Sequence, residues 1–208
     1  WQRAVGRYGD KVSNLRLQGE DVYMGIVTSE VTAISVPTGK SRWVSRTSSS
    51  VLAAPAVSPD GKLVAVGTTS GTVEVLSNQT GSIVAKFTTE NEILASPIFA
   101  RDLVLAGSTD NCLYGYSMQN QRLEFVEELS DDILVDLCAW KDDVVAVTAD
   151  GKVYLLDTAQ RKIAWSRDLK AQATCMGTSP SGIHLGTSDG SFITLDPKTG
   201  EKSWSLSL

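Results

Sequence analysis

The clearest copy of an internal repeat in this chain reads Leu185-Gly186-Thr187-Ser188-Asp189-Gly190-Ser191-Phe192-Ile193-Thr194-Leu195-Asp196-Pro197-Lys198-Thr199-Gly200-Glu201-Lys202-Ser203-Trp204. It contains an apolar run, a small residue with Ser or Thr, a tight polar turn, a second apolar run, a Thr-Gly turn and an aromatic residue. The first apolar run of this pattern recurs at 22–27, 63–68, 103–108, 144–148 and 183–188. A period of about 40 residues is typical of an architecture built from one repeated unit.

Two columns of equivalent residues support this period. The turn between the two apolar runs aligns five residues: Ser29, Gly71, Asn111, Gly151 and Gly190. Glycine and asparagine tolerate a positive φ angle most easily, so this turn is predicted to adopt one. Fourteen residues farther on, the second column holds Trp43, Ala85, Phe125, Trp165 and Trp204, and Trp1 extends it backward.

Each repeat is predicted to form four short strands. The innermost strands are expected at 12–17, 51–57, 93–99, 134–139 and 173–178, and the apolar runs given above follow them. Third strands are expected at 31–36, 72–76, 112–116, 152–156 and 191–195, and the last strand of each repeat surrounds the aromatic column. No window carries a sustained apolar stripe with the 3.6-residue period of a helix, and β-branched residues dominate. The chain is therefore predicted to be all-β.

The apolar runs are continuous rather than alternating, as in Leu63-Val64-Ala65-Val66, so both faces of these strands must be covered. With no helix predicted, neighbouring sheets have to supply the cover, and a radial array of four-stranded sheets does so. We predict a β-propeller of about five four-stranded blades, with repeats at approximately 7–48, 49–89, 90–129, 130–169 and 170–208. The aromatic column is interpreted as packing residues between blades: Trp1, Trp43, Phe125, Trp165 and Trp204.

Composition places the chain among ordinary folded proteins. It has 208 residues, of which 42% are apolar and 21% charged, and a formal net charge of −5. These values favour a single soluble domain and argue against nucleic acid or an anionic membrane surface as the main partner. No apolar run is long enough to cross a membrane, so direct membrane insertion is not expected.

The residue patterns of common enzyme and metal sites are missing from the sequence. His184 is the only histidine, and Cys112, Cys138 and Cys175 lie in separate apolar runs. No CxxC, HExxH, Gly-x-Ser-x-Gly, phosphate-binding glycine loop or DxDxDG calcium loop occurs. We therefore predict no catalytic residue, no bound metal and no cofactor.

The fifth repeat, from Leu185 to Trp204, resembles the repeat of the quinoprotein-type (PQQ-like) β-propellers, and the second repeat is similar to a WD40-like blade. The PQQ-like superfamily includes quinone-dependent alcohol dehydrogenases and the non-catalytic scaffold BamB. The resemblance covers nearly the whole chain. It departs from the pattern at Ala85, which replaces the aromatic residue, and at Gln121 and Arg161, which replace the glycine of the Thr-Gly turn.

The number of blades leaves two architectures open. The resemblance implies seven or eight blades, whereas this chain carries five repeats, with 1–6 read as an extra outer strand. The chain is then either a segment of a larger propeller or a compact five-bladed ring with a spare strand. An open ring would leave strand edges at both ends, and such edges invite pairing with a partner or a second copy.

The repeat and the missing catalytic patterns predict a non-catalytic scaffold for protein–protein interactions within a larger assembly. Loops that join consecutive blades are expected to share one rim, and two neighbouring loops carry six carboxylates: Glu90, Glu92, Glu127, Glu128, Asp131 and Asp132. We call these six residues the acidic rim. Such a surface would attract a basic segment of another protein and speed its encounter. The alternative is that these are solvated loop charges that keep the protein soluble.

The alternative function is a quinone (PQQ)-dependent dehydrogenase or a degenerate remnant of one. The resemblance implies that such an enzyme needs a Ca²⁺ site and a pair of adjacent cysteines. Cys138 is followed by Ala139 and Cys175 by Met176, so the adjacent pair is missing.

The compartment stays open. Unpaired cysteines favour the cytoplasm over the periplasm or the ER lumen. The triplet Asn78-Gln79-Thr80, which fits the N-glycosylation pattern, favours a secretory compartment.

Overall fold

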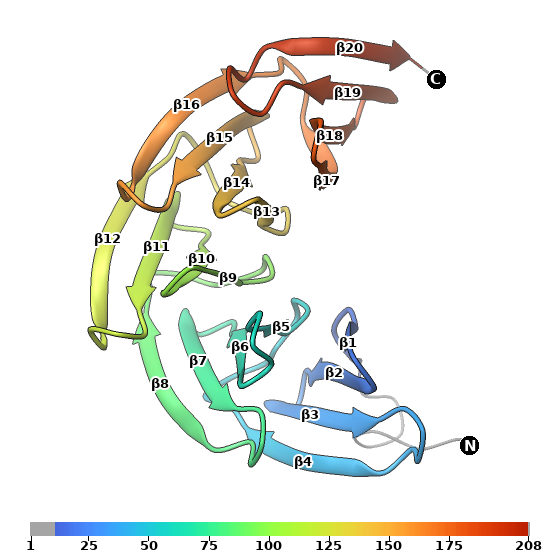
Figure 1. Cartoon of the computed structure of the whole chain (residues 1–208), viewed down its shortest axis with the longest axis vertical. Helices are drawn as coiled ribbons and strands as arrows, with labels where there is room; N and C mark the ends of the chain where they lie inside the picture. Colours follow the sequence, from blue (N-terminus) through green and yellow to red (C-terminus); the bar gives the residue numbers. More distant parts are fainter. Residues whose placement is uncertain (1–10, 208) are drawn as a thin grey trace.

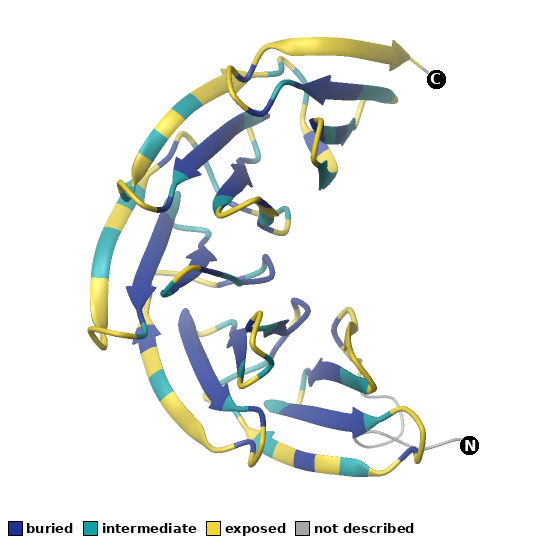
Figure 2. Ribbon diagram, viewed as in Figure 1, coloured by how far each residue is buried: buried dark blue, intermediate teal, exposed yellow. Residues whose placement is uncertain are grey.

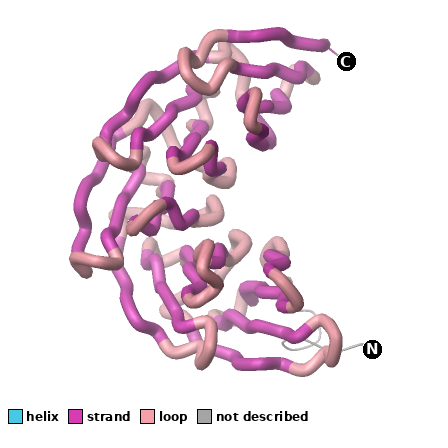
Figure 3. Tube along the Cα trace, viewed as in Figure 1, coloured by secondary structure: helices cyan, strands magenta, loops and turns pink. Residues whose placement is uncertain are grey.

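The computed structural model describes residues 11–207, which form five four-stranded sheets (Figure 1). Within every sheet consecutive strands pair antiparallel, so the chain completes one blade before it starts the next. Figure 3 shows strands and loops along this trace, as the predicted all-β class requires. The predicted extra strand at 1–6, which includes Trp1, lies outside the described residues.

The five blades follow one another around an open arc (Figure 1). The innermost strands line the concave side of the arc, and the outermost strands form its convex side. The first and last blades lie at opposite ends of the arc. The compact five-bladed ring is therefore wrong, and the arrangement is that of part of a larger propeller.

The innermost strands are shorter than predicted in the first four blades. They are β1 (Arg16–Gln18), β5 (Ala56–Val57), β9 (Ile98–Ala100), β13 (Cys138–Trp140) and β17 (Ala173–Ser179). In the second and third blades, Pro55 and Pro97 stand directly before the strand. Proline has no N–H to donate, so strand pairing starts after it. The first and fourth blades have no proline there and their inner strands are short as well, whereas β17 of the fifth blade runs nearly as predicted.

The second and third strands form the buried centre of each blade (Figure 2). Second strands are β2 (Asp21–Ile26), β6 (Leu63–Gly67), β10 (Leu103–Gly107), β14 (Asp143–Val147) and β18 (Gly182–Thr187). Third strands are β3 (Glu30–Ser35), β7 (Thr72–Ser77), β11 (Cys112–Ser117), β15 (Lys152–Asp157) and β19 (Ser191–Leu195). These strands lie close to their predicted positions, because an apolar run that is buried on both faces is a strong signal.

Every outer strand contains a β-bulge at the same register. These strands are β4 (Ser41–Arg46), β8 (Ile83–Thr88), β12 (Arg122–Glu128), β16 (Lys162–Asp168) and β20 (Lys202–Ser207). In the first blade, Trp43 pairs with Ala33, and the register shifts before Ser41 pairs with Ile34. A bulge re-aims the side chains beside it. It therefore sets the direction of the aromatic column in each blade.

The hairpin turns adopt the backbone conformation that the sequence predicts. All five members of the turn column have positive φ angles, including Ser29 at 64° and Asn111 at 67°. The Thr-Gly turn has a positive φ as well, and Gln121 and Arg161 keep it at 51° and 55° although they are not glycine. The substitutions at these two turns therefore changed the side chain and preserved the turn.

The hydrophobic core lies between blades. Four clusters of buried residues each combine side chains from two consecutive blades. In the first three blades the second strand carries a glycine, Gly25, Gly67 or Gly107, under an aliphatic side chain of the next connection. A Cβ added to Gly67 would lie 2.2 Å from Ile93 Cγ2, and one added to Gly107 would lie 2.3 Å from Ile133 Cγ2. Neighbouring backbones approach closely because these positions carry no side chain.

We call the packed contact between two consecutive blades a joint and number the joints along the chain. At the fourth joint, between the fourth and fifth blades, the large residue lies on the second strand and the small one where the connection enters the fifth blade. Val147 occupies the strand position of the glycine, and the small Ala173 occupies the position of the isoleucine. Both side chains are buried in the cluster that joins the fourth and fifth blades. The joint thus pairs a large residue with a small one in every case, as close packing requires.

Two tryptophans of the aromatic column bridge consecutive blades. Trp43 Nε1 donates to the Asn78 carbonyl at 2.8 Å, and a Cβ on Gly81 would lie 2.8 Å from the Trp43 ring. Trp165 Nε1 donates to the Pro197 carbonyl at 3.0 Å, and its ring lies against Gly200 in the same way. The glycine of the Thr-Gly turn therefore leaves room for the indole of the preceding blade.

The other members of the column lie differently. The Phe125 ring folds over Gly115 of its own blade and packs against the core between the third and fourth blades. Trp204 is 51% exposed and lies against Phe192 of its own blade, with ring centroids 5.5 Å apart. Within residues 11–207, no following blade covers it (Figure 2).

An ion pair stands at the third joint. Arg161, in the turn that has lost its glycine, pairs with Glu124 of the preceding blade and lies 3.6 Å from Asp102. The Glu124 side chain is nearly buried. A charged contact thus takes the place that an indole and a glycine occupy at the first and fourth joints.

At the fourth joint the large and the small residue have exchanged places. Substitutions of the corresponding pair at the third joint, Gly107 and Ile133, should therefore have strongly coupled effects on stability. Gly107→Val should lower the free energy of unfolding by about 1–3 kcal/mol through overpacking, and Ile133→Ala by about 2–5 kcal/mol through the cavity it leaves. The double variant should lose clearly less than the sum, because valine can fill the space that Ile133 leaves. Urea unfolding of the four proteins measures this coupling, and strictly additive losses would contradict the packing described.

The exposure of the two tryptophans predicts unequal effects of truncation. Trp43 is 7% exposed and Trp204 is 51% exposed. Trp43→Ala should cost about 3–5 kcal/mol of stability, as for other buried aromatic residues, and should also remove the hydrogen bond from the indole to the Asn78 carbonyl. Trp204→Ala, the matched control, should cost much less. Equal shifts in the unfolding midpoint would show that Trp43 does not join the blades.

Candidate functional site

The acidic rim lies where the connections between blades meet the hairpin turns between second and third strands. Backbone hydrogen bonds join these two kinds of loop: Thr109 N–H donates to the Glu92 carbonyl at 3.0 Å, and Ala149 N–H donates to the Asp132 carbonyl at 2.8 Å. Each connection is therefore held against the hairpin turn of the blade it enters. The turns between first and second and between third and fourth strands lie at the opposite ends of the strands.

Both acidic connections contact the same turn, which joins β10 to β11. Glu90 N–H donates to Asp110 Oδ2 of this turn at 2.9 Å. On its other side, Leu129 N–H donates to the Asn111 carbonyl at 2.7 Å. The structure thus places Glu90 and Glu92 on one side of the turn and the segment that leads to Asp131 and Asp132 on the other.

Glu127 and Glu128 belong to a strand rather than to the connection. They are the last residues of β12, opposite Leu113 and Cys112 of β11. This position still keeps them beside the β10–β11 turn. The boundary differs from the sequence-based one because the outer strand continues until it reaches Cys112, the first residue of its antiparallel partner β11.

Asp110 is a further carboxylate of this surface that the sequence analysis did not include. Counting charges only in the connections between blades overlooks the hairpin turns on the same rim. The repeat register contains the signal, since Asp110 precedes the turn position Asn111 as Asp150 precedes Gly151. Asp110 therefore lies between the two acidic connections.

The carboxylates of this surface are not neutralised by cations within residues 11–207. In this part of the chain, none of the six acidic-rim residues forms an ion pair, and neither does Asp110. Burial raises the pKa of the Cys112 thiol, and the negative charges of Asp110, Glu128 and Glu90 raise it further. The geometry agrees, because Cys112 N–H donates to Asp110 Oδ1 at 3.0 Å and Cys112 pairs with Glu128 across the strands.

Buried hydroxyl groups hold the rim in place. Tyr114 Oη donates to Asp110 Oδ2 at 2.7 Å and accepts from Glu90 N–H at 3.3 Å. Tyr154, one repeat later, accepts from Ser130 N–H at 3.2 Å. Burial raises the pKa of Tyr114, and its bond to Asp110 adds to this, so the hydroxyl keeps its proton. Each connection is thereby anchored on the blade that follows it.

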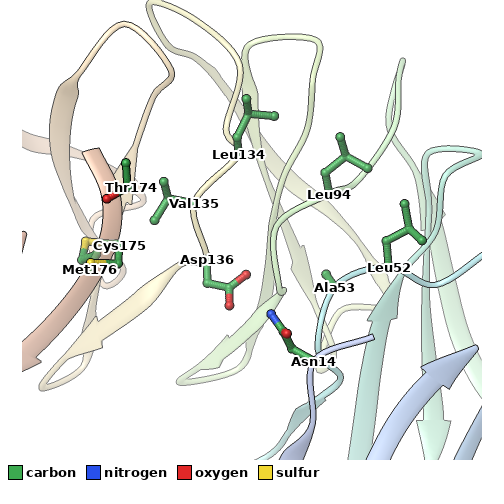
Figure 4. A pocket seen from close by; sticks show the side chains of 10 residues that line it. All are labelled: Asn14, Leu52, Ala53, Leu94, Leu134, Val135, Asp136, Thr174, Cys175 and Met176. Carbon is green, nitrogen blue, oxygen red and sulfur yellow. The ribbon is translucent and has the colours of Figure 1, made fainter. Parts of the chain in front are cut away.

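A pocket of about 290 Å³ lies on the concave side of the arc (Figure 4). It is lined by residues from all five blades: Asn14, Leu52, Ala53, Leu94, Leu134, Val135, Asp136, Thr174, Cys175 and Met176. Asp136 Oδ1 accepts from Ser96 N–H of the preceding blade at 2.7 Å. The pocket therefore combines aliphatic side chains with polar groups, among them one carboxylate.

The cysteines and the histidine are spread over different blades. Cys112, Cys138 and Cys175 are free thiols. His184 lies between the Ser179 hydroxyl at 2.9 Å and the Thr194 hydroxyl at 3.0 Å. In the part of the chain that the structure describes, no three His, Cys, Asp or Glu side chains are placed to hold a metal ion, and no helix there is long and apolar enough to cross a membrane.

Comparison with protein families identifies one match. The family described as outer membrane protein assembly factor BamB matches residues 27–134 and 128–208. No curated protein matches the chain.

Solved structures share the fold. BamB from Moraxella catarrhalis superimposes with a TM-score of 0.75 at 24% identity, over 91% of this chain and 58% of the BamB chain. The computationally designed protein Ika8 gives 0.83 at 19% identity, over 94% and 61% of the two chains. A chain of the mitotic checkpoint complex gives 0.86 at 12% identity, over 99% and 67%. The chain thus spans about three fifths of the first two structures.

The hairpin turn between β18 and β19, which lies on the same rim, predicts a measurable shift in the pKa of Asp189. The Thr187 hydroxyl donates to Asp189 Oδ1 at 2.6 Å, and this bond, followed by that of Ser191 N–H, lowers the pKa of Asp189. Such a group stabilises the fold above the pKa it has in the unfolded chain, and this contribution is lost as pH falls through its folded value. Thr187→Val should therefore raise the pKa of Asp189 in an NMR titration of the carboxyl carbons. Thr148→Val, which changes the equivalent turn one blade earlier, should leave Asp189 unchanged.

Proposed function

Because this chain belongs to the family of the outer membrane protein assembly factor BamB, we propose that it is a non-catalytic β-propeller scaffold that binds other proteins through its acidic rim. The chain contributes a rigid surface to a larger assembly and recognises a basic segment of its partner.

The rigidity of the surface supports this role. Each of the two connections that carry the acidic rim is hydrogen-bonded to the hairpin turn of the blade before it and to that of the blade after it. Their anchor residues Ile93 and Ile133 are fully buried between blades. A preorganised surface does not lose much conformational freedom when a partner binds, and this saves binding free energy.

The observation that carries the proposal is the convergence of unpaired carboxylates on one turn. Glu90 N–H bonds to Asp110 in the β10–β11 turn, Glu128 pairs with Cys112 at the end of that turn, and Leu129 N–H, just before Asp131 and Asp132, bonds to Asn111. Within residues 11–207 none of the six acidic-rim residues pairs with a cation, and neither does Asp110. Solvated charges that serve solubility alone need no common location. A cluster on one rim produces a field that attracts a basic segment over roughly one Debye length, about 10 Å at 0.1 M salt.

The last blade offers the scaffold a second surface for a partner. Every residue of β20 is exposed, including Trp204 and Leu206. We propose that this outer edge pairs with a partner strand, because an exposed strand presents unpaired backbone groups.

The acidic rim predicts charge-dependent binding of a basic probe. In the variant Glu90→Gln/Glu92→Gln/Asp131→Asn/Asp132→Asn, a fluorescent nonalysine peptide should bind about tenfold more weakly and associate more slowly, since four attractive charges are removed. Fluorescence anisotropy and stopped-flow association at 50 and 200 mM salt measure both effects. The variant should also lose most of the salt dependence.

A variant on the opposite rim is the matched control. Glu20→Gln/Asp60→Asn/Asp157→Asn/Glu201→Gln removes the same number of charges at the turns on the other side of the blades. It should retain most of the affinity of the unaltered protein for the peptide. If both variants weaken binding equally, the probe senses net charge alone and the acidic rim is not a binding surface.

A further inference from the structure

Three leucines occupy the same position in consecutive blades and point toward solvent. Leu52, Leu94 and Leu134 each follow a fully buried aliphatic residue, Val51, Ile93 and Ile133 respectively. Leu52 is 43% exposed, Leu134 is 44% exposed and Leu94 is partly exposed. We call these three residues the leucine strip.

The packing of the blades does not require leucine at this position. The buried residue before it makes the joint between blades, as Ile133 does against Gly107. In the fifth blade Thr174 follows the buried Ala173, so a polar residue is compatible with the fold. Single exposed aliphatic residues are common on protein surfaces, but a contiguous group marks an interaction surface.

The leucine strip lines the pocket on the concave side of the arc. In Figure 4 the side chains of Leu52, Leu94 and Leu134 lie in a row and point the same way, above Asp136 and Asn14. One acceptor of Asp136 is used by Ser96 N–H. The strip thus has a carboxylate on its inner side.

The leucine strip and the acidic rim are close along the chain. Glu92 and Asp132 of the acidic rim stand two residues before Leu94 and Leu134. In each case one buried isoleucine, Ile93 or Ile133, separates the rim residue from the leucine in the sequence. The chain therefore passes from the acidic rim to the leucine strip within two residues in two consecutive blades.

We propose that the leucine strip and the acidic rim form one docking surface for an amphipathic basic segment of a partner protein. The aliphatic side chains of that segment lie on Leu52, Leu94 and Leu134, and its Lys or Arg residues face Glu92, Asp132 and Asp136. This inference rests on the proposed function and adds the apolar half of the partner's chemistry. A neutral apolar peptide would leave the flanking carboxylates unpaired, and an anionic lipid surface would be repelled by them.

Two peptides of equal charge test the apolar contribution. Both carry six lysines, and three further positions are leucine in one peptide and serine in the other. The unaltered protein should bind the leucine peptide about tenfold more tightly, because leucine side chains leave water on binding. Fluorescence anisotropy at 150 mM salt gives both dissociation constants.

Variants of the protein locate the contact. Leu94→Ser/Leu134→Ser should abolish the preference for the leucine peptide and leave binding of the serine peptide unchanged. Leu17→Ser/Leu123→Ser removes two exposed leucines that do not line the pocket and should preserve the preference. Circular dichroism and the unfolding midpoint confirm that each variant is folded.

The outcomes separate this inference from the proposed function. If the serine peptide binds at the acidic rim and the leucine peptide binds no more tightly, the leucine strip is not part of the docking surface and the proposed function stands. If neither peptide binds, the acidic-rim function itself fails. Equal binding of a neutral leucine peptide, or binding of anionic phosphatidylglycerol vesicles, would overturn the assignment of a basic protein segment.

Discussion

A four-stranded blade with apolar residues on both faces can be shielded only by another blade. The structure meets this need at each joint by pairing a large side chain with a small one, Ile133 with Gly107 and Val147 with Ala173. The core therefore lies between blades, and the blades have to follow one another around an axis. The arc is a consequence of this packing, because no blade can turn away without exposing its centre strands.

The same joints determine where charged and apolar side chains meet. Ile93 and Ile133 each hold their connection against the preceding blade. The residue before each isoleucine lies on the rim, and the residue after it faces the concave side. Glu92, Ile93 and Leu94 show this sequence of environments in three consecutive residues. A basic amphipathic partner would thus be recognised by side chains whose positions are set by a single buried isoleucine.

The strands that sequence reasoning placed well are those buried on both faces. Their continuous apolar runs and the turns beside them, including Ser29 and Asn111 with positive φ, follow from local chemistry. The inner strands were placed less well: Pro55 and Pro97 delay pairing in the second and third blades, and residues such as Val51, Ile93 and Ile133 pack between blades instead of pairing. The six rim carboxylates were predicted as one surface, whereas Asp110 joins them through the hydrogen bond from Glu90 N–H, which spans two blades.

The repeat, its all-β class and the kind of unit that must be stacked are local properties, written in spacing and hydrophobic pattern. Whether the blades close, which tryptophans are covered and which leucines face solvent depend on how neighbouring units fit. Trp43 and Trp204 hold the same place in the repeat, yet one is buried under Gly81 and the other is half exposed. The pattern is the same for both because spacing records a residue's place within its own blade, whereas burial depends on the blade beside it.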